Sequence, residues 1–211
     1  MLIKLHDLAT LKTTMPGGET ATIRGLYLTE DLHVRAIAAD LGGLFDLSTV
    51  AIPADAFGTP DIDAGSWPAD VPTDAIRTCA SVGERPASAL EAIREVVLSP
   101  LPDHHDGLRS AATYKGLQLD VSEGPAGRVL DLVIDTDTMT APFLVVETGS
   151  WLPERQVLLP TARLSKVDWS DNTAHIDATQ DDIKAAPDVF KNDRLTTKGS
   201  GTLLTYYGLS A

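Results

Sequence analysis

The sequence predicts a mainly β protein made of two small β-rich domains of similar layout, one on each side of a short central helix. Short apolar runs alternate with turn-forming residues about every 8–12 residues, a spacing typical of all-β sandwiches and barrels. The same order of runs occurs in both halves of the 211-residue chain. Aromatic residues make up only 5% of the chain, so we expect cores built from Val, Leu, Ile and Ala.

The second half carries the clearer strand signals. Val129–Ile134 is an apolar run bounded by Gly127 and by the turn-forming stretch 135–138. Further runs expected as strands are 143–147, 156–159, 166–169 and 174–177. Neighbouring runs at hairpin distance favour antiparallel pairing.

The first half repeats this plan. Ile23–Leu28 lies 106 positions before Val129–Ile134, and Val50–Pro53 lies 107 positions before Val157–Pro160. Residues 34–39 match the run at 143–147 more weakly. At the starts of the two halves, the overlay pairs Leu5, Ala9, Thr10 and Lys12 with Leu108, Ala112, Thr113 and Lys115.

Each half is expected to close with a short helix. Thr179–Asp182 has the form of a capping box, in which a hydroxyl and an acid three residues later bind free N–H groups. Its counterpart is 73–77, and one longer helix is expected over 86–98, followed by Ser99-Pro100. The expected domains are 1–83, a helix and linker over 84–107, a second repeat over 108–190, and a tail over 191–211.

Several motifs of the second half carry a resemblance to a known family. They are Gly127–Asp131, Ile134-Asp135, Thr148–Pro153, Val157–Pro160, Val167–Trp169 and Thr179–Pro187, with Tyr206–Gly208 in the tail. These motifs resemble those of tandem, two-copy PRC-barrel proteins, closely over roughly 106–190 and loosely over 3–80. The first half departs from the pattern, because Leu44-Phe45-Asp46 replaces Trp-Leu-Pro and 61–67 lacks Val-Asp-Trp.

The resemblance implies a small antiparallel β-barrel of about six strands in each half, with short helices and one connecting helix. The family includes the cytoplasmic domain of the photosynthetic reaction-centre H subunit and a domain of a ribosome-maturation factor. In those settings the barrel docks on other proteins and has no common catalytic residues. The resemblance therefore implies a non-enzymatic adaptor without a cofactor, which we expect to self-associate as a homo-oligomer, most simply a dimer.

The net charge of the chain indicates which classes of partner it can bind. The chain has 30 acidic and 17 basic residues, for a net charge of −13. Such a surface repels phosphate backbones and anionic lipids, and Lys and Arg are scattered singly. We therefore expect no nucleic acid among the partners and no membrane insertion. The excess acid is either a solubility adaptation or a face aimed at a basic protein partner.

The cysteine content, the N-terminal sequence and the lengths of the apolar runs indicate the cellular compartment. Cys79 is the only cysteine, which excludes an internal disulfide and is typical of a reducing compartment. Its apolar surroundings, 75–80, indicate a small core residue more than a nucleophile. The N-terminus lacks the pattern of a signal peptide, and no apolar run reaches the roughly 18 residues of a membrane span. A cytoplasmic protein is expected.

One motif suggests catalysis. Val133–Thr138 ends a strand in Asp135-Thr-Asp137-Thr, which is how haloacid-dehalogenase-type phosphotransferases present a nucleophile beside Mg²⁺. That fold needs a parallel sheet with long helices, and here the motif falls in a hairpin turn. Asp181-Asp182 and Lys166 are the only candidates for its other acids and its lysine. A Mg²⁺-dependent phosphatase using Asp135 and Asp137 is therefore a remote alternative.

Other candidates are binding sites. His104-His105, flanked by aspartates, lacks a second ligand group at metal spacing and is expected to be a solvated linker. His6, His33 and His175 are isolated in sequence. Trp151 and Trp169 are the candidate interaction surface, because aromatic residues dominate interface hot spots; packing over the barrel mouths is the alternative. A small molecule or ion in the cleft between the barrels is the alternative function.

Overall fold

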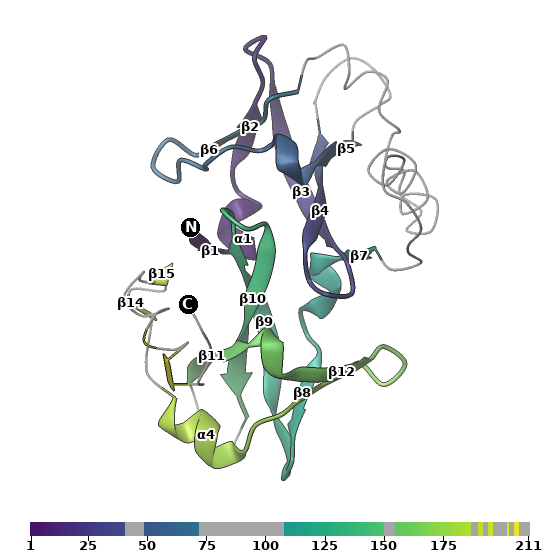
Figure 1. The fold of residues 1–211 in the computed structure, drawn as a ribbon, viewed down its shortest axis with the longest axis vertical. Coiled ribbons are helices and arrows are strands. Elements are labelled where there is room, and N and C mark those ends of the chain that lie inside the picture. Colours follow the sequence, from purple (N-terminus) through teal and green to yellow (C-terminus); the bar gives the residue numbers. More distant parts are fainter. Residues whose placement is uncertain are drawn as a thin grey trace. The chain divides into compact units, whose positions relative to one another are not determined.

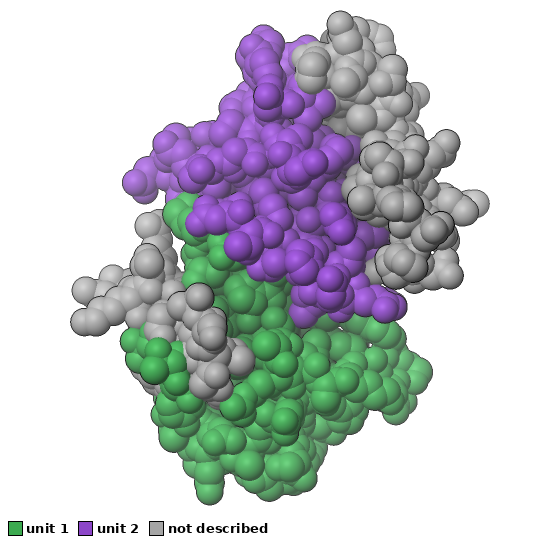
Figure 2. All heavy atoms as spheres, in the orientation of Figure 1, with its two compact units in different colours: residues 1–5, 113–135, 141–211 green, residues 6–112, 136–140 purple. Residues whose placement is uncertain are grey.

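The structure is a computed structural model, and it describes eight stretches of the chain. These are 1–40, 49–71, 108–149, 155–186, 190–191, 194–195, 202 and 205–206, the last two stretches lying in the tail. The expected helices at 73–77 and 86–98 and the expected domain boundaries at 83/84 and 107/108 lie outside these residues. The described residues form two compact units, coloured separately in Figure 2. Unit 1 comprises 1–5, 113–135 and 141–211, and unit 2 comprises 6–112 and 136–140.

Unit 1 is built around one sheet with the strand order β11-β10-β9-β8-β13-β12, and β1 pairs with the end of β9 (Figure 1). Its strands are β1 (Leu2–Lys4), β8 (Gln118–Val121), β9 (Gly124–Asp135), β10 (Thr140–Thr148), β11 (Gln156–Pro160), β12 (Leu164–Asp168) and β13 (Thr173–Ile176). A short hairpin, β14 (Phe190–Lys191) with β15 (Arg194–Leu195), follows. The strands expected in this half are confirmed, and β1 and β8 are additional.

Unit 2 contains a second sheet with the order β5-β4-β3-β2-β6, and β7 pairs with β3. Its strands are β2 (Lys12–Thr14), β3 (Thr20–Leu28), β4 (Val34–Asp40), β5 (Thr49–Pro53), β6 (Ser66–Pro68) and β7 (Arg109–Ser110). The three strands expected in the first half are confirmed as β3, β4 and β5.

The two sheets have equivalent registers. Ile3 pairs with Ile134 in unit 1, and Arg109 pairs with Leu28 in unit 2, so both members differ by 106 positions. From the β3–β4 turn onward the offset is 107: Leu32 and Met139 both have positive φ, 62° and 51°. Lys12 of β2 occupies the place of Gln118 in β8, because each is the first residue of a parallel strand pair, with Ser66 and Thr173 as the partners. The sequence overlay of Lys12 with Lys115 was therefore wrong by three positions.

The first strand of each sequence half pairs in the sheet formed by the other half. β1 lies against Val133–Asp135 at the end of β9, and β7 lies against Tyr27 and Leu28 at the end of β3. A division of the chain into one unit per contiguous half therefore does not describe the strand pairing, since residues 1–5 belong to unit 1 and 108–112 to unit 2.

The sheets are mixed, not purely antiparallel. β8 and β13 are parallel in unit 1, as are β2 and β6 in unit 2. Among the described residues neither sheet closes into a barrel. The unit 1 sheet ends at β11 and β12, and the unit 2 sheet ends at β5 and β6. The expectation of antiparallel barrels is thus met only in part: the protein is mainly β, with two mixed sheets. Apolar runs predict strands but carry no signal for a parallel pair between β8 and β13, which are 55 residues apart at their starts.

The described helices are all short. They are α1 (Leu5–Leu8), η1 (Ala54–Ala56), η2 (Ala111–Tyr114), η3 (Thr161–Arg163) and α4 (Gln180–Ala185), of which the longest, α4, has six residues. The helix expected at 179–187 is thereby confirmed. No helix in the described part of the chain has the length and apolar character needed to cross a bilayer.

The cores are aliphatic, as the composition indicates. Leu132, Val133 and Ile134 of β9 are consecutive and fully buried, so both faces of this strand are covered. In unit 2 the largest buried side chain is Trp67 of β6, whose indole N–H donates to the carbonyl of Gly58 at 2.7 Å. The ring of Phe57 meets it edge-on, with centroids 4.9 Å apart.

Candidate functional site

Trp169, one of the two tryptophans of the candidate interaction surface, lies in the turn that joins β12 to β13 and is partly exposed. Its ring meets the ring of Tyr114 at 85°, with centroids 5.1 Å apart. Tyr114 ends η2 and is only 4% exposed. The indole therefore packs against a buried side chain of unit 1, and Trp169 as a whole remains partly exposed.

The turn under Trp169 is held by the carboxylate of Asp168. Its Oδ1 accepts the N–H of Ser170 at 3.2 Å and that of Asp171 at 3.3 Å, together with the Ser170 hydroxyl at 2.7 Å. Asn172 adopts a positive φ of 55° and donates from Nδ2 to the carbonyl of Gly116 at 3.3 Å. Hydrogen bonds of Asp168 and of Asn172, which lie before and after Trp169 in the sequence, thus hold the turn that carries it.

A charge pair stands beside this turn. Lys166 Nζ lies 2.8 Å from Asp168 Oδ2 on the same face of β12. The hydrogen bond from Lys166 and those from Ser170 and Asp171 hold the pKa of Asp168 far below its ordinary value. Asp168 in turn raises the pKa of Lys166. Both groups are therefore charged across the physiological range.

The same turn recurs in unit 2 without an aromatic ring. The Asp61 carboxylate accepts the N–H of Ala64 at 2.8 Å, as Asp168 accepts that of Asp171 at a shift of 107 positions. Gly65 has a φ of 66° where Asn172 has 55°. Ile62 occupies the position of Trp169, so the presented ring belongs to unit 1 among the described residues.

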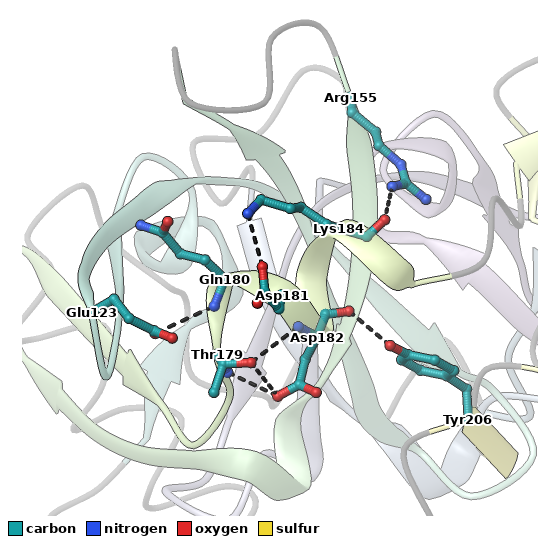
Figure 3. Close-up of polar contacts among 8 residues, drawn as sticks. All are labelled: Glu123, Arg155, Thr179, Gln180, Asp181, Asp182, Lys184 and Tyr206. Carbon is teal, nitrogen blue, oxygen red and sulfur yellow. Dashed lines mark hydrogen bonds and ion pairs between the residues drawn. The ribbon is translucent and has the colours of Figure 1, made fainter.

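Trp151, the other candidate, lies outside the described residues, but Thr148 before it and Arg155 after it are described. The N–H and hydroxyl of Thr148 both donate to the carbonyl of Arg155, each at 3.0 Å. The Arg155 guanidinium donates to the carbonyls of Lys184 and Ala186 at the C-terminal end of α4, and Figure 3 shows the first of these contacts. Arg155, which follows this segment in the sequence, is thus bonded to the C-terminal end of α4.

The two acids of α4, Asp181 and Asp182, have different partners. Thr179 and Asp182 form the expected capping box: Thr179 Oγ1 accepts the N–H of Asp182 at 3.0 Å, and Asp182 Oδ2 accepts the N–H of Thr179 at 2.9 Å (Figure 3). The N–H and the hydroxyl of Thr179 both donate to Asp182 Oδ2 and lower the pKa of Asp182. Lys184 pairs with Asp181 at 2.8 Å, and the Tyr206 hydroxyl donates to the carbonyl of Asp182 at 3.0 Å.

The residues of the phosphatase alternative have structural contacts. Asp135 ends β9 and forms an ion pair with the amino group of Met1 at 3.0 Å, whereas Asp137 is exposed in the turn that follows. Lys166 pairs with Asp168 and Asp181 with Lys184, as described above. Within the described stretches, no group of three or more His, Cys, Asp and Glu side chains could hold a metal ion.

The remaining candidate residues are histidines and the single cysteine. His33 lies 3.0 Å from Asp31 in the β3–β4 turn, and His175 lies on β13. His104, His105 and Cys79 lie outside the described residues.

Sequence reasoning missed three contacts that shape this region. They are the ring of Tyr114 under Trp169, the Arg155 cap on α4, and the ion pair of Lys115 with the buried Asp131 at 3.0 Å. Each joins residues 16 to 55 positions apart. Local patterns carry no signal at such separations.

No protein-family model matches the chain, and a search of curated proteins finds no match.

Proposed function

We propose that the chain is a non-enzymatic, cytoplasmic interaction module built from two diverged PRC-barrel copies, which self-associates and presents Trp169 to a protein partner. The PRC-barrel part is supported by the motifs of 106–190 and by the equivalent registers of the two sheets at offsets of 106 and 107. An adaptor role is what the family resemblance implies.

The observation that carries the proposal is the presentation of Trp169. A partly exposed indole is seated on the buried ring of Tyr114, in a turn fixed by Asp168. A pre-ordered aromatic side chain loses little conformational entropy on binding, which is why such residues dominate interface hot spots. Trp67 of unit 2, by contrast, is fully buried.

Charge indicates the kind of partner. With a net charge of −13, the module attracts basic protein surfaces and repels nucleic acid. Asp168 and Asp171 flank Trp169 in the turn, and so a partner would meet the indole together with carboxylates.

The test is affinity capture with the full chain, compared by quantitative mass spectrometry for wild type, Trp169→Ala and Tyr206→Ala. Tyr206 is the matched control, because it is an exposed aromatic residue of the same unit, 39% accessible, in a different place. We expect a protein that is recovered by wild type and by Tyr206→Ala and is lost at least about tenfold with Trp169→Ala. Its direct binding is then measured with purified components.

Two results would contradict the proposal. One is that no captured protein distinguishes Trp169→Ala from wild type while circular dichroism shows both to be folded. The other is a Mg²⁺-dependent phosphatase activity of the purified chain that Asp135→Asn abolishes.

A further inference from the structure

The edge of the unit 1 sheet at β12 is an open strand edge. β12 pairs with β13, and no second strand lies beside it among the described residues. None of its five residues is buried. An edge strand presents a row of main-chain N–H and C=O groups that can pair with another strand.

The other strands that end the two sheets differ from β12. β11 buries four of its five residues, and β6 buries Trp67 completely. In β5 the side chains of Ala51 and Ile52 are fully buried. Among these four sheet ends, β12 alone has no buried residue in the described part of the chain.

The outward sequence of β12 is self-complementary. Lys166 and Asp168 stand on one face, two residues apart, with side chains 64% and 25% exposed, and Val167 lies between them on the other face. When two copies of this strand pair antiparallel about Val167, Lys166 of each copy faces Asp168 of the other. Val167 then faces Val167.

We infer that the chain forms a two-fold symmetric dimer by antiparallel pairing of β12 with β12 of a second copy, in the register centred on Val167. The inference rests on the self-association in the proposed function and is independent of the role given to Trp169. Opposite charges directly across an antiparallel pair stabilise it, and like charges destabilise it. The pairing places four charges in alternation, because each Lys166 already lies 2.8 Å from Asp168 of its own strand.

Competing registers are excluded by the same charges. A pairing centred on Lys166 sets the two lysines against each other, and one centred on Asp168 sets the two carboxylates against each other. The irregularity between Leu164 and Lys166, where the register with β13 shifts, limits the regular edge to 166–168. Lysine on an edge strand usually prevents association; here only the Val167-centred register neutralises it.

Charge reversal tests the register. Sedimentation equilibrium of the wild-type chain is expected to show a monomer–dimer equilibrium. Lys166→Asp and Asp168→Lys should each raise the dimer dissociation constant about tenfold or more, because two attractive pairs become repulsive. An equimolar mixture of the two variants should dimerise again, since each lysine then meets an aspartate in the other chain.

Asp168 also holds the turn before β13, so Asp168→Lys is checked by circular dichroism, and a second measurement does not depend on it. In a Cys79→Ser background, Val167→Cys should form an intermolecular disulfide rapidly, because the two cysteines face each other. Asp171→Cys is the control, because residue 171 lies in the turn beyond β12 and its two copies do not face each other in this register.

Three outcomes would overturn the inference. A dimer that is insensitive to Lys166→Asp, or one that cross-links as fast at 171 as at 167, would show that β12 is not the interface, and the self-association in the proposed function would stand. A wild-type chain that stays monomeric at its highest attainable concentration would overturn that self-association as well, and the capture experiment with Trp169→Ala would remain a separate test.

Discussion

Gly127 of β9 lies directly against the main chain of Glu147 in β10: a Cβ added to Gly127 would come within 2.2 Å of the Glu147 carbonyl oxygen. Real Cβ atoms do not approach an oxygen so closely, and the Gly127 φ of 151° is also one that other residues rarely adopt. A side chain at 127 would therefore force β9 and β10 apart. We expect Gly127→Ala to lower the free energy of unfolding by about 2–4 kcal/mol, measured by urea denaturation.

Gly25 is the control for this substitution. It lies in β3 of unit 2, and an added Cβ would meet nothing within 4 Å. Gly25→Ala should leave stability unchanged or raise it by up to about 1 kcal/mol, because alanine restricts the unfolded chain. Equal destabilisation by the two substitutions would contradict the close approach of Gly127 to Glu147.

The ion pair of Lys115 with Asp131 gives a second prediction. Asp131 is a buried acid of β9, and the Lys115 ammonium lies 3.0 Å from its Oδ1. Lys115→Met removes the cation and leaves the carboxylate buried. We expect a loss of about 1–3 kcal/mol in the free energy of unfolding, toward the lower end because the lysine side chain is 34% exposed.

Lys12→Met is the matched control, since Lys12 is an exposed lysine of β2. It should change stability by less than about 0.5 kcal/mol. Thermal melts of the two variants beside wild type separate the cases, and similar losses for both would show that the pair with Asp131 is not what stabilises β9.

Local apolar runs and caps could be predicted from the sequence, because the signal and the structure occupy the same few residues. Val129–Ile134 predicts the buried part of β9, and Thr179 with Asp182 predicts the capping box of α4. The offset of 107 that matches Val50–Pro53 with Val157–Pro160 also relates β5 to β11 in the structure.

What the sequence could not show depends on pairing between distant residues. β1 and β7 have three and two residues, too short for a periodic signal, and both pair across more than 80 positions. The match of Lys12 with Lys115 looked sound because identical residues agreed at one spacing, yet strand register aligns Lys12 with Gln118. In the candidate site, residue type alone made Trp169 a candidate, which stays a prediction, and its contact with Tyr114 had no signal in the sequence.

Acid should weaken the N-terminal cap of α4. The N–H and hydroxyl of Thr179 stabilise the ionised form of Asp182 and lower its pKa in the folded protein. The cap is therefore fully effective above the unfolded-state value of about 3.9 and is lost as the pH falls through the lower folded-state pKa. We expect the melting temperature of wild type to fall from about pH 4 downward, and less steeply in Asp182→Asn, which lacks this carboxylate.

Asp63→Asn is the control, because Asp63 is an exposed aspartate of unit 2. Its melting temperature should follow that of wild type across the same titration. If the acid slope of Asp182→Asn also follows wild type, the capping box does not contribute to acid sensitivity.

The pairing of β1 with β9 leads to the last prediction. Ile3 is 7% exposed and pairs with Ile134, more than 130 positions away in sequence. Ile3→Asp would bury a carboxylate without a partner, so β1 should detach and leave the N–H groups of 133–135 open to solvent. Hydrogen exchange measured by mass spectrometry should then be at least about tenfold faster over 131–135.

Other segments distinguish this local effect from general unfolding. Residues 124–128 of β9 pair with β8, and residues 27–28 of β3 pair with β7, so both should keep their protection in Ile3→Asp. Ile3→Val, which removes one methyl group and keeps the strand apolar, should leave exchange over 131–135 close to wild type. Protection lost equally over 27–28 and 131–135 would mean that β1 supports both units; unchanged exchange over 131–135 would mean that β9 does not depend on β1 at all.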